Sequence, residues 1–266
     1  MACLTTIEMV AIYVCKADPM KNVYLFGNWK MYLDYEESIA WAHTLSERVS
    51  DIASHIVPAL FPSAIAFKDV AETLRATPYA LGAQHACWVD RGAYTGEVAI
   101  ETYRKLGARY VLVGHSERRH IFHETNHEVR LQVDATLASG LCPVVCVGET
   151  RDERDKGIAD ESIEAQVRAA CTGLAVTQET DLIIAYEPVW AIHAGQACDP
   201  REANRVHTLI KRLVNGLVGV ADVAVVYGGS VNEQNMSGFL AQESVNGLLV
   251  GGASIKESTW FELVSR

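Results

Sequence analysis

The chain of 266 residues lacks the features that membrane, secreted and metal-binding proteins require. No apolar run reaches the length of about 20 residues that spans a bilayer. The seven cysteines are scattered, with no C-x-x-C pair and no Cys/His spacing typical of a metal site. We therefore expect reduced thiols, no metal, no membrane partner and a cytoplasmic location.

Basic charge is also scarce. Lysine and arginine number 23 against 33 aspartates and glutamates, which gives a net charge of -10 and a pI near 5.4. This balance argues against a general affinity for nucleic acid or for anionic membranes. An anionic small substrate is still compatible with it, because helix N-termini and one local lysine can act against the overall field.

The first nineteen residues match no common targeting signal. The apolar run Met9–Cys15 is short and no basic segment precedes it, and the stretch contains no arginine. Met20 stands just before the first expected core strand and is a natural start. We expect residues 1–19 to be an N-terminal extension, either an added tail or a mis-assigned start, and residues 20–266 to form the functional domain.

From about residue 23 onward, short apolar runs alternate with segments of helical periodicity. Eight strands separated by helices imply parallel pairing with right-handed crossovers. Eight such units in roughly 250 residues predict a single-domain α/β fold, the (β/α)8 TIM barrel, with a doubly wound open sheet as the competing topology. The expected strands are Val23–Phe26, Ile56–Phe61, Tyr79–Ala83, Tyr110–Val113, Pro143–Val147, Leu182–Tyr186, Val223–Tyr227 and Gly247–Val250. The expected helices include Ser38–Val49, Val129–Ala138, Ser162–Leu174 and Glu202–Val214.

Glu187 stands where the sixth expected strand must end, because Pro188 lacks the amide needed to continue it. Apolar neighbours follow the carboxylate, so we expect partial desolvation and a raised pKa, which suits a general base at neutral pH. A single glutamate at a strand end is more often a solvated rim residue. The residues at the other strand ends decide between these interpretations.

Two glycine pairs follow the last two expected strands. Gly228-Gly229-Ser230 and Gly251-Gly252 let backbone amides approach an anion at the start of a following helix. One such pair usually marks a plain turn. Two pairs on consecutive final strands match the place where (β/α)8 barrels build a phosphate site, so we expect one here.

Polar residues also follow the first and fourth expected strands. Lys30, two residues after Asn28, could supply the fixed positive charge that an anionic substrate needs, although a surface lysine is the alternative. His115 precedes a helical turn whose amide could donate to the ring and favour neutral imidazole. The alternative for His115 is a hydrogen-bonded core histidine.

Eight segments of the chain, in the same order, resemble the triosephosphate isomerase family. The resemblance covers the chain from about residue 22 to its end, and the eight segments together are highly specific. The matching segments are Gly27–Met31, Gly82–Gln84, Gly92–Glu97, Val113–Arg119, Val145–Glu149, Ala185–Ile192, Tyr227–Val231 and Gly247–Ser254.

The resemblance implies interconversion of dihydroxyacetone phosphate and D-glyceraldehyde 3-phosphate through an enediolate, without cofactor or metal. Glu187 matches the base that moves the proton, and His115 matches the neutral electrophile that polarises the carbonyl. Lys30 matches the cation that holds the substrate, Asn28 its neighbour near the substrate oxygens, and Glu117 the buried partner of the lysine.

The resemblance also implies a lid over the phosphate, from Pro188 to Cys198. Tyr227 and Ser230 match the residues that latch the closed lid, and Gly229, Gly251 and Gly252 match the phosphate-binding backbone. The lid departs from the family pattern at Ile192-His-Ala-Gly-Gln196, where the family usually has Ile-Gly-Thr-Gly-Lys. His193 replaces the glycine whose amide contacts the phosphate, which puts lid kinetics in question. His123 replaces a second usual glycine.

Partners follow from the same resemblance: a triose phosphate substrate and a second copy of the chain. Residues 85–96 match the long loop that inserts into the partner subunit, and Thr95 matches the residue that reaches the neighbouring active site. We therefore expect a homodimer. Two alternatives are another phosphosugar isomerase on the same barrel and a phosphate-ligand-binding barrel with impaired turnover.

Overall fold

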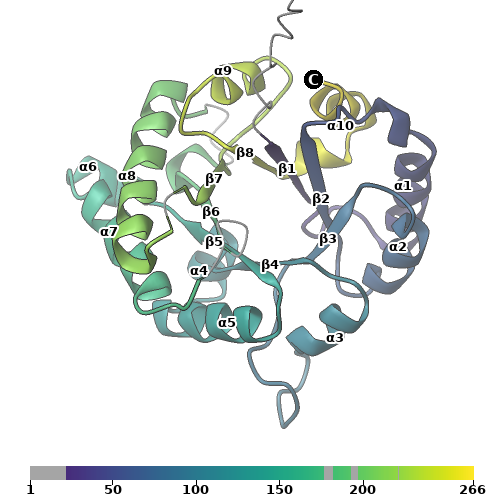
Figure 1. The fold of residues 1–266 in the computed structure, drawn as a ribbon, viewed down its shortest axis with the longest axis horizontal. Coiled ribbons are helices and arrows are strands. Elements are labelled where there is room, and N and C mark those ends of the chain that lie inside the picture. Colours follow the sequence, from purple (N-terminus) through teal and green to yellow (C-terminus); the bar gives the residue numbers. More distant parts are fainter. Residues whose placement is uncertain (1–21, 177–181, 193–196, 221) are drawn as a thin grey trace, which may run out of the picture.

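The eight strands form a closed parallel barrel in the order β1 to β8 (Figure 1). The computed structural model describes residues 22–176, 182–192, 197–220 and 222–266. β1 pairs with both β2 and β8, so the expected (β/α)8 barrel is confirmed and the open sheet is wrong. The strands are β1 Val23–Asn28, β2 Ile56–Phe61, β3 Ala80–Ala83, β4 Tyr110–Val113, β5 Cys142–Val147, β6 Ile183–Tyr186, β7 Ala224–Tyr227 and β8 Gly247–Val250.

A ring of helices surrounds the barrel (Figure 1). The four expected helices are present, but each begins two or three residues earlier than hydrophobic periodicity predicts. For α1 and α5 the reason is that Asp34 and Thr125 form capping boxes in polar segments. Asp199 caps α8 and Pro200 opens it. The helices are α1 Tyr35–Glu47, α2 Phe67–Leu74, α3 Ile100–Lys105, α4 Ser116–Ile121, α5 Asn126–Ala138, α6 Arg151–Asp155, α7 Ala159–Cys171, α8 Pro200–Val218, α9 Met236–Leu240 and α10 Glu257–Val264.

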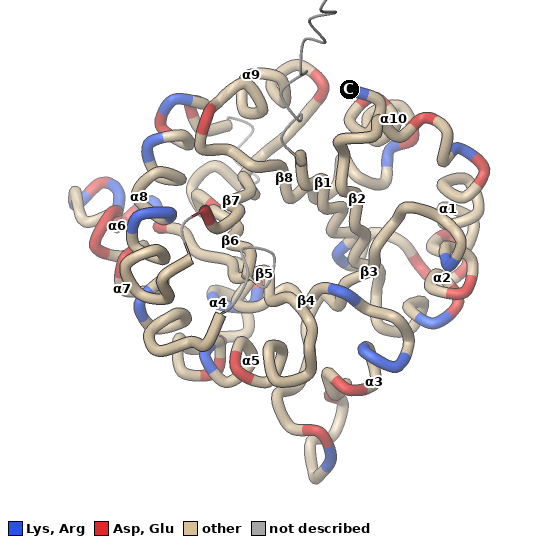
Figure 2. The backbone as a smooth tube through the Cα atoms, in the orientation of Figure 1, with Lys and Arg blue, Asp and Glu red and all other residues tan. Residues whose placement is uncertain are grey.

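The core has two layers, one inside the barrel and one between strands and helices. On β4, Tyr110 and Leu112 belong to the interior cluster, whereas Val111 and Val113 belong to the outer one. This alternation follows from the two-residue period of a strand. Charged residues lie mostly on the helical ring and its loops, and the strands carry almost none (Figure 2). The apolar runs of the sequence therefore form the strands of the barrel.

Three further expectations concern the N-terminal extension, membrane spans and the cysteines. Residues 1–19 lie outside the described residues. Within the described ranges, no helix is long and apolar enough to cross a membrane. The described cysteines Cys87, Cys142, Cys146, Cys171 and Cys198 form no disulfide bond.

His123, just after α4, has the left-handed backbone that favours glycine, with a φ of 59°. Its position is a helix end, where the Glu124 amide donates to the Arg118 carbonyl at 3.1 Å. We expect His123→Gly to raise the free energy of unfolding by about 1 kcal/mol, because the replacement relieves this strain. Urea denaturation followed by circular dichroism would measure the change.

The matched control is His127→Gly, because His127 is also exposed but lies in the first turn of α5. Glycine inside a helix costs about 0.5–1 kcal/mol, so this variant should lose stability. Equal destabilisation of the two variants would show that the His123 backbone is not strained.

Candidate functional site

A cavity of about 240 Å³ opens at the carboxyl ends of the strands. This is the end of the barrel where the sequence places its polar residues and glycines, and where barrel enzymes carry their chemistry. Both expected glycine pairs contribute to the wall. The lining residues are Asn28, Lys30, Tyr32, His115, Glu187, Ile192, Gly228, Gly229, Ser230, Val231, Leu249, Gly251, Gly252 and Ala253.

Glu187 lies directly after β6, with only 2% of its surface exposed. Its amide continues the ladder by donating to the Val147 carbonyl at 2.8 Å, after which Pro188 ends the strand. Glycines flank it on both neighbouring strands. A Cβ atom on Gly148 would lie 1.8 Å from the Glu187 carbonyl oxygen, and one on Gly228 would lie 2.9 Å from Glu187 Cγ. The glycines after β5 and β7 therefore make room for this residue.

The Glu187 carboxylate contacts two groups that follow β4. Its Oε1 lies 2.9 Å from His115 Nε2, and its Oε2 accepts a hydrogen bond of 2.8 Å from the Ser116 amide. The Glu117 amide donates to His115 Nδ1 at 3.2 Å, as the sequence predicted from the helical turn. Since Nδ1 is an acceptor, the ring proton is on Nε2 and points at Glu187. The imidazole is therefore a neutral hydrogen-bond donor.

The expected rise in the pKa of Glu187 is wrong for this arrangement. Burial raises the pKa of the carboxyl group, as the apolar neighbours suggested. However, the interactions with the His115 ring, the Ser116 amide and the Lys30 ammonium outweigh burial, so the pKa lies below its ordinary value. Glu187 is therefore ionised at neutral pH, as a proton acceptor must be.

Lys30 has a left-handed backbone, with a φ of 49°, which is unusual for a residue with a side chain. Two hydrogen bonds stabilise this conformation: the Lys30 amide donates to Asn28 Oδ1 at 3.0 Å, and Gln84 Nε2 donates to the Lys30 carbonyl at 2.8 Å. The ammonium lies 2.6 Å from Glu117 Oε1. The Glu117 side chain is 32% exposed, so in a single chain it is not the buried partner that the resemblance implies.

Two side chains contact the ends of the lid segment. Ser230 Oγ donates to the Ala191 carbonyl at 2.7 Å, and the Tyr227 hydroxyl accepts from the Cys198 amide at 3.2 Å. Tyr227 is fixed by stacking on Phe239, with ring centroids 4.0 Å apart. His193 lies outside the described residues. Thr95 is exposed and does not line the cavity of its own chain.

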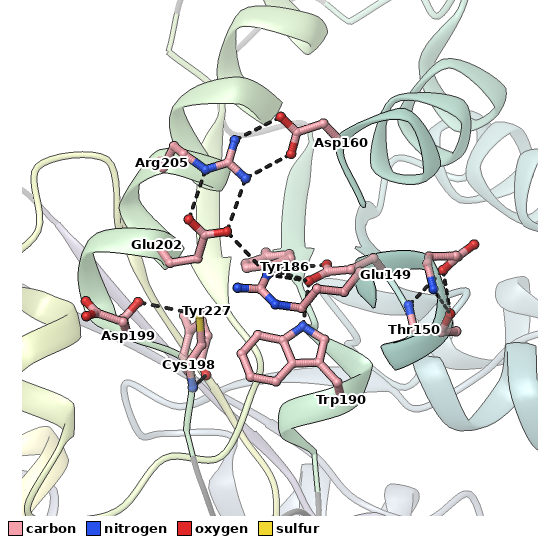
Figure 3. Close-up of polar contacts among 12 residues, drawn as sticks. Glu149, Thr150, Asp160, Tyr186, Trp190, Cys198, Asp199, Glu202, Arg205 and Tyr227 are labelled. Atoms are coloured by element: carbon pink, nitrogen blue, oxygen red, sulfur yellow. Dashed lines mark hydrogen bonds and ion pairs between the residues drawn. The ribbon is translucent and has the colours of Figure 1, made fainter. Parts of the chain in front are cut away.

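A buried network holds the first turn of the lid (Figure 3). The Trp190 indole donates to Glu149 Oε1 at 2.6 Å, and the Tyr186 hydroxyl donates to the same carboxylate. The Arg154 guanidinium lies 4.4 Å from the Trp190 ring centroid and 3.5 Å from Glu149 Oε1. The sequence marked Glu149 as a polar strand end but gave no signal for Arg154, because helical spacing does not reveal contacts between different helices.

The network of charged side chains continues from the lid to the outer helices. Arg154 pairs with Glu202 at 3.3 Å, and Arg205 bridges Glu202 to Asp160 on α7 at 2.9 Å (Figure 3). Glu202 lies in the first turn of α8, which begins directly after the lid. The same network therefore ties the two ends of the lid together through α6 and α8.

The closed barrel and the polar cavity at the carboxyl ends of its strands define the class of (β/α)8-barrel enzymes. The family model described as "Triosephosphate isomerase" matches residues 23–266. The triosephosphate isomerase of Roseiflexus castenholzii is 40% identical over 248 residues, covering 92% of this chain and 97% of that protein.

Two further relatives extend the similarity across distant bacteria. The triosephosphate isomerase of Aquifex aeolicus is 40% identical over 241 residues, covering 90% of this chain and 96% of that protein. That of Caldanaerobacter subterraneus is 36% identical over 249 residues, covering 92% of this chain and the whole of that protein. The chain therefore belongs to the triosephosphate isomerase family.

Gly148→Ala tests how far the site depends on the glycine beside Glu187. The added methyl group would collide with the Glu187 backbone, and a shift of about 1 Å can cost on the order of 100-fold in rate. We expect turnover in a triose phosphate isomerisation assay to fall at least tenfold, with a lower melting temperature.

Gly216→Ala is the matched control, since a Cβ on Gly216 in α8 would meet nothing within 4 Å. This variant should keep full turnover and melt at the same or a higher temperature. Unchanged turnover in Gly148→Ala would mean that Glu187 tolerates displacement and that the glycine is not required.

Proposed function

We propose that this chain interconverts dihydroxyacetone phosphate and D-glyceraldehyde 3-phosphate, with Glu187 as the base. The observation that carries the proposal is the buried pair of the Glu187 carboxylate and the His115 Nε2 proton, 2.9 Å apart, in the cavity that also contains Lys30 and both glycine pairs. An enediolate intermediate needs a proton acceptor and fixed hydrogen-bond donors in one dry site. This group of residues supplies both.

The proposed first step begins with the separation of Glu187 from His115. The carboxylate then accepts a proton from the substrate carbon next to the carbonyl, and the His115 Nε2 proton becomes free to donate to the carbonyl oxygen. Lys30 stabilises the negative charge that develops on the substrate oxygens. Glu187 then returns the proton to the adjacent carbon while the hydroxyl on the other carbon gives its proton back to His115 Nε2 and becomes the new carbonyl, which completes the isomerisation and leaves the enzyme unchanged.

The phosphate is assigned to the glycine pairs. The backbone at Gly229 and at Gly251-Gly252 lines the cavity without side chains, so amides are accessible to an anion. The ionised Glu187 and the donor His115 favour turnover over ligand binding alone, since a passive phosphate site needs no base. His193 remains a proposed phosphate contact on the basis of the family pattern.

Glu187→Gln tests the function most directly, because it keeps the shape of the side chain and removes proton acceptance. We expect turnover to fall about 10²–10⁴-fold, since general-base catalysis contributes this much. The measurement is a coupled assay with D-glyceraldehyde 3-phosphate, beside a binding titration with a phosphorylated inhibitor.

Glu161→Gln on α7 is the control, because Glu161 is exposed and lies outside the cavity lining. It should have the turnover of the native chain. Near-native turnover in Glu187→Gln would show that Glu187 is not the base. If the native chain itself does not turn over D-glyceraldehyde 3-phosphate, the proposed reaction is contradicted.

We also propose that the chain forms a homodimer through residues 85–96. This segment extends away from the ring of helices between β3 and α3 (Figure 1), and residues 90–97 are exposed. Large apolar side chains are exposed in loops at the same end of the barrel: Met31 is 94% exposed, Ile65 76% and Phe122 63%. Such side chains are typical of a surface that another protein covers. A partner there would also cover Glu117 and bring Thr95 to the neighbouring site.

Dilution tests the dimer. We expect sedimentation equilibrium to give twice the chain mass, and activity per chain to fall when the protein is diluted below the dissociation constant. Met31→Lys should weaken association, because it places a charge in the covered surface, whereas Ile158→Lys at the exposed start of α7 should not. A native chain that is monomeric and fully active would contradict the interlocking-loop proposal.

A further inference from the structure

Two side chains from the loop after β1 contact the glycine pair after β8. A Cβ atom on Gly251 would lie 3.4 Å from Lys30 Cε, and one on Gly252 would lie 3.6 and 3.8 Å from Tyr32 Cε2 and Cζ. Cζ carries the phenol hydroxyl, so the polar edge of the Tyr32 ring lies over the Gly252 backbone. Lys30 and Tyr32 therefore lie beside the two residues of one phosphate-type turn.

The position of Tyr32 is fixed although its side chain is 47% exposed. Its amide donates to the Trp29 carbonyl at 3.1 Å, which closes a turn directly after Lys30, and its side chain lines the cavity. Within the described part of the chain, the Tyr32 hydroxyl has no hydrogen-bond partner, whereas the nearby Tyr35 hydroxyl donates to Asp69. Tyr32 is thus a free donor at the rim of the cavity.

We propose that the Tyr32 hydroxyl donates a hydrogen bond to the phosphate group of the substrate. The inference rests on the proposed function for the identity of the phosphorylated substrate. A phosphate bound at the Gly229 and Gly252 amides has more acceptor oxygens than these amides satisfy, and a phenol donor to an anionic oxygen makes a strong, short hydrogen bond. In a chain with a net charge of -10, local donors must supply the attraction.

The placement also separates Tyr32 from the proton-transfer machinery. Glu187 and His115 follow β6 and β4, whereas Tyr32 and Gly252 follow β1 and β8, at the phosphate end of the cavity. Tyr32 therefore acts on phosphate affinity and on discrimination between phosphorylated and unphosphorylated substrates. It takes no part in moving the proton.

Tyr32→Phe tests the proposal, because it removes the hydroxyl and keeps the ring against Gly252. The loss of one hydrogen bond to a charged group should raise the dissociation constant of inorganic phosphate about five- to tenfold. Calorimetry would measure this constant. The KM for D-glyceraldehyde 3-phosphate should rise similarly with little change in kcat. With unphosphorylated D-glyceraldehyde, kcat/KM should equal that of the native chain.

Tyr35→Phe is the matched control, since it removes a phenol hydroxyl three residues away that lies outside the cavity lining. It should leave all three measurements unchanged. Native phosphate affinity in Tyr32→Phe would overturn the inference, and so would an equal loss with D-glyceraldehyde, which would indicate a structural role. Because phosphate binding is measured without turnover, a native chain that binds phosphate but does not isomerise would contradict only the proposed function.

Discussion

The pairing of β1 with β8 is the constraint on which the rest of the structure depends. It closes the sheet, and closure brings the carboxyl ends of all eight strands around one opening. Without it, Lys30 after the first strand and the glycine pair after the last strand would lie at opposite edges of an open sheet. With it, the Lys30 side chain lies 3.4 Å from the Cβ position of Gly251. The site is therefore a consequence of closure, because its lining residues lie at the ends of β1, β4, β6, β7 and β8.

Within the site, the hydrogen bond between His115 and Glu187 controls two chemical groups at once. Burying a carboxylate without partners would favour its neutral form, but the His115 ring and the Ser116 amide keep it ionised. The same bond uses the His115 Nε2 proton, which cannot donate to another acceptor while the bond is present. In the proposed reaction, breaking this bond makes a charged base and a neutral donor available together, and neither acts on the substrate while the bond is present.

Much of the fold was predictable from the sequence, because buried parallel strands are continuous apolar runs and every expected strand falls within a residue or two of an observed one. The positions of Glu187, His115 and Lys30 in one cavity also followed, since parallel strands share an end. The direction of the Glu187 pKa shift could not be predicted from the sequence. Its apolar sequence neighbours suggested a rise, whereas the contacts that lower the pKa come mainly from residues after β4. Arg154 and Tyr32 were missed for the same reason, because their contacts join segments far apart in the chain.

Among the described residues, Lys30 and His123 are the two that carry a side chain and have a left-handed backbone, and their surroundings differ. Asn28 and Gln84 hydrogen-bond to the Lys30 backbone, and the conformation directs its ammonium toward the cavity. These hydrogen bonds offset the energetic cost of the strained Lys30 backbone, and this backbone conformation orients the ammonium group. His123 lies after a short helix on the exposed surface and does not line the cavity at the strand ends. Strain alone therefore does not identify a functional residue. At Lys30 the strained backbone coincides with supporting hydrogen bonds and with a place in the cavity lining, and it is this combination that supports the proposed role.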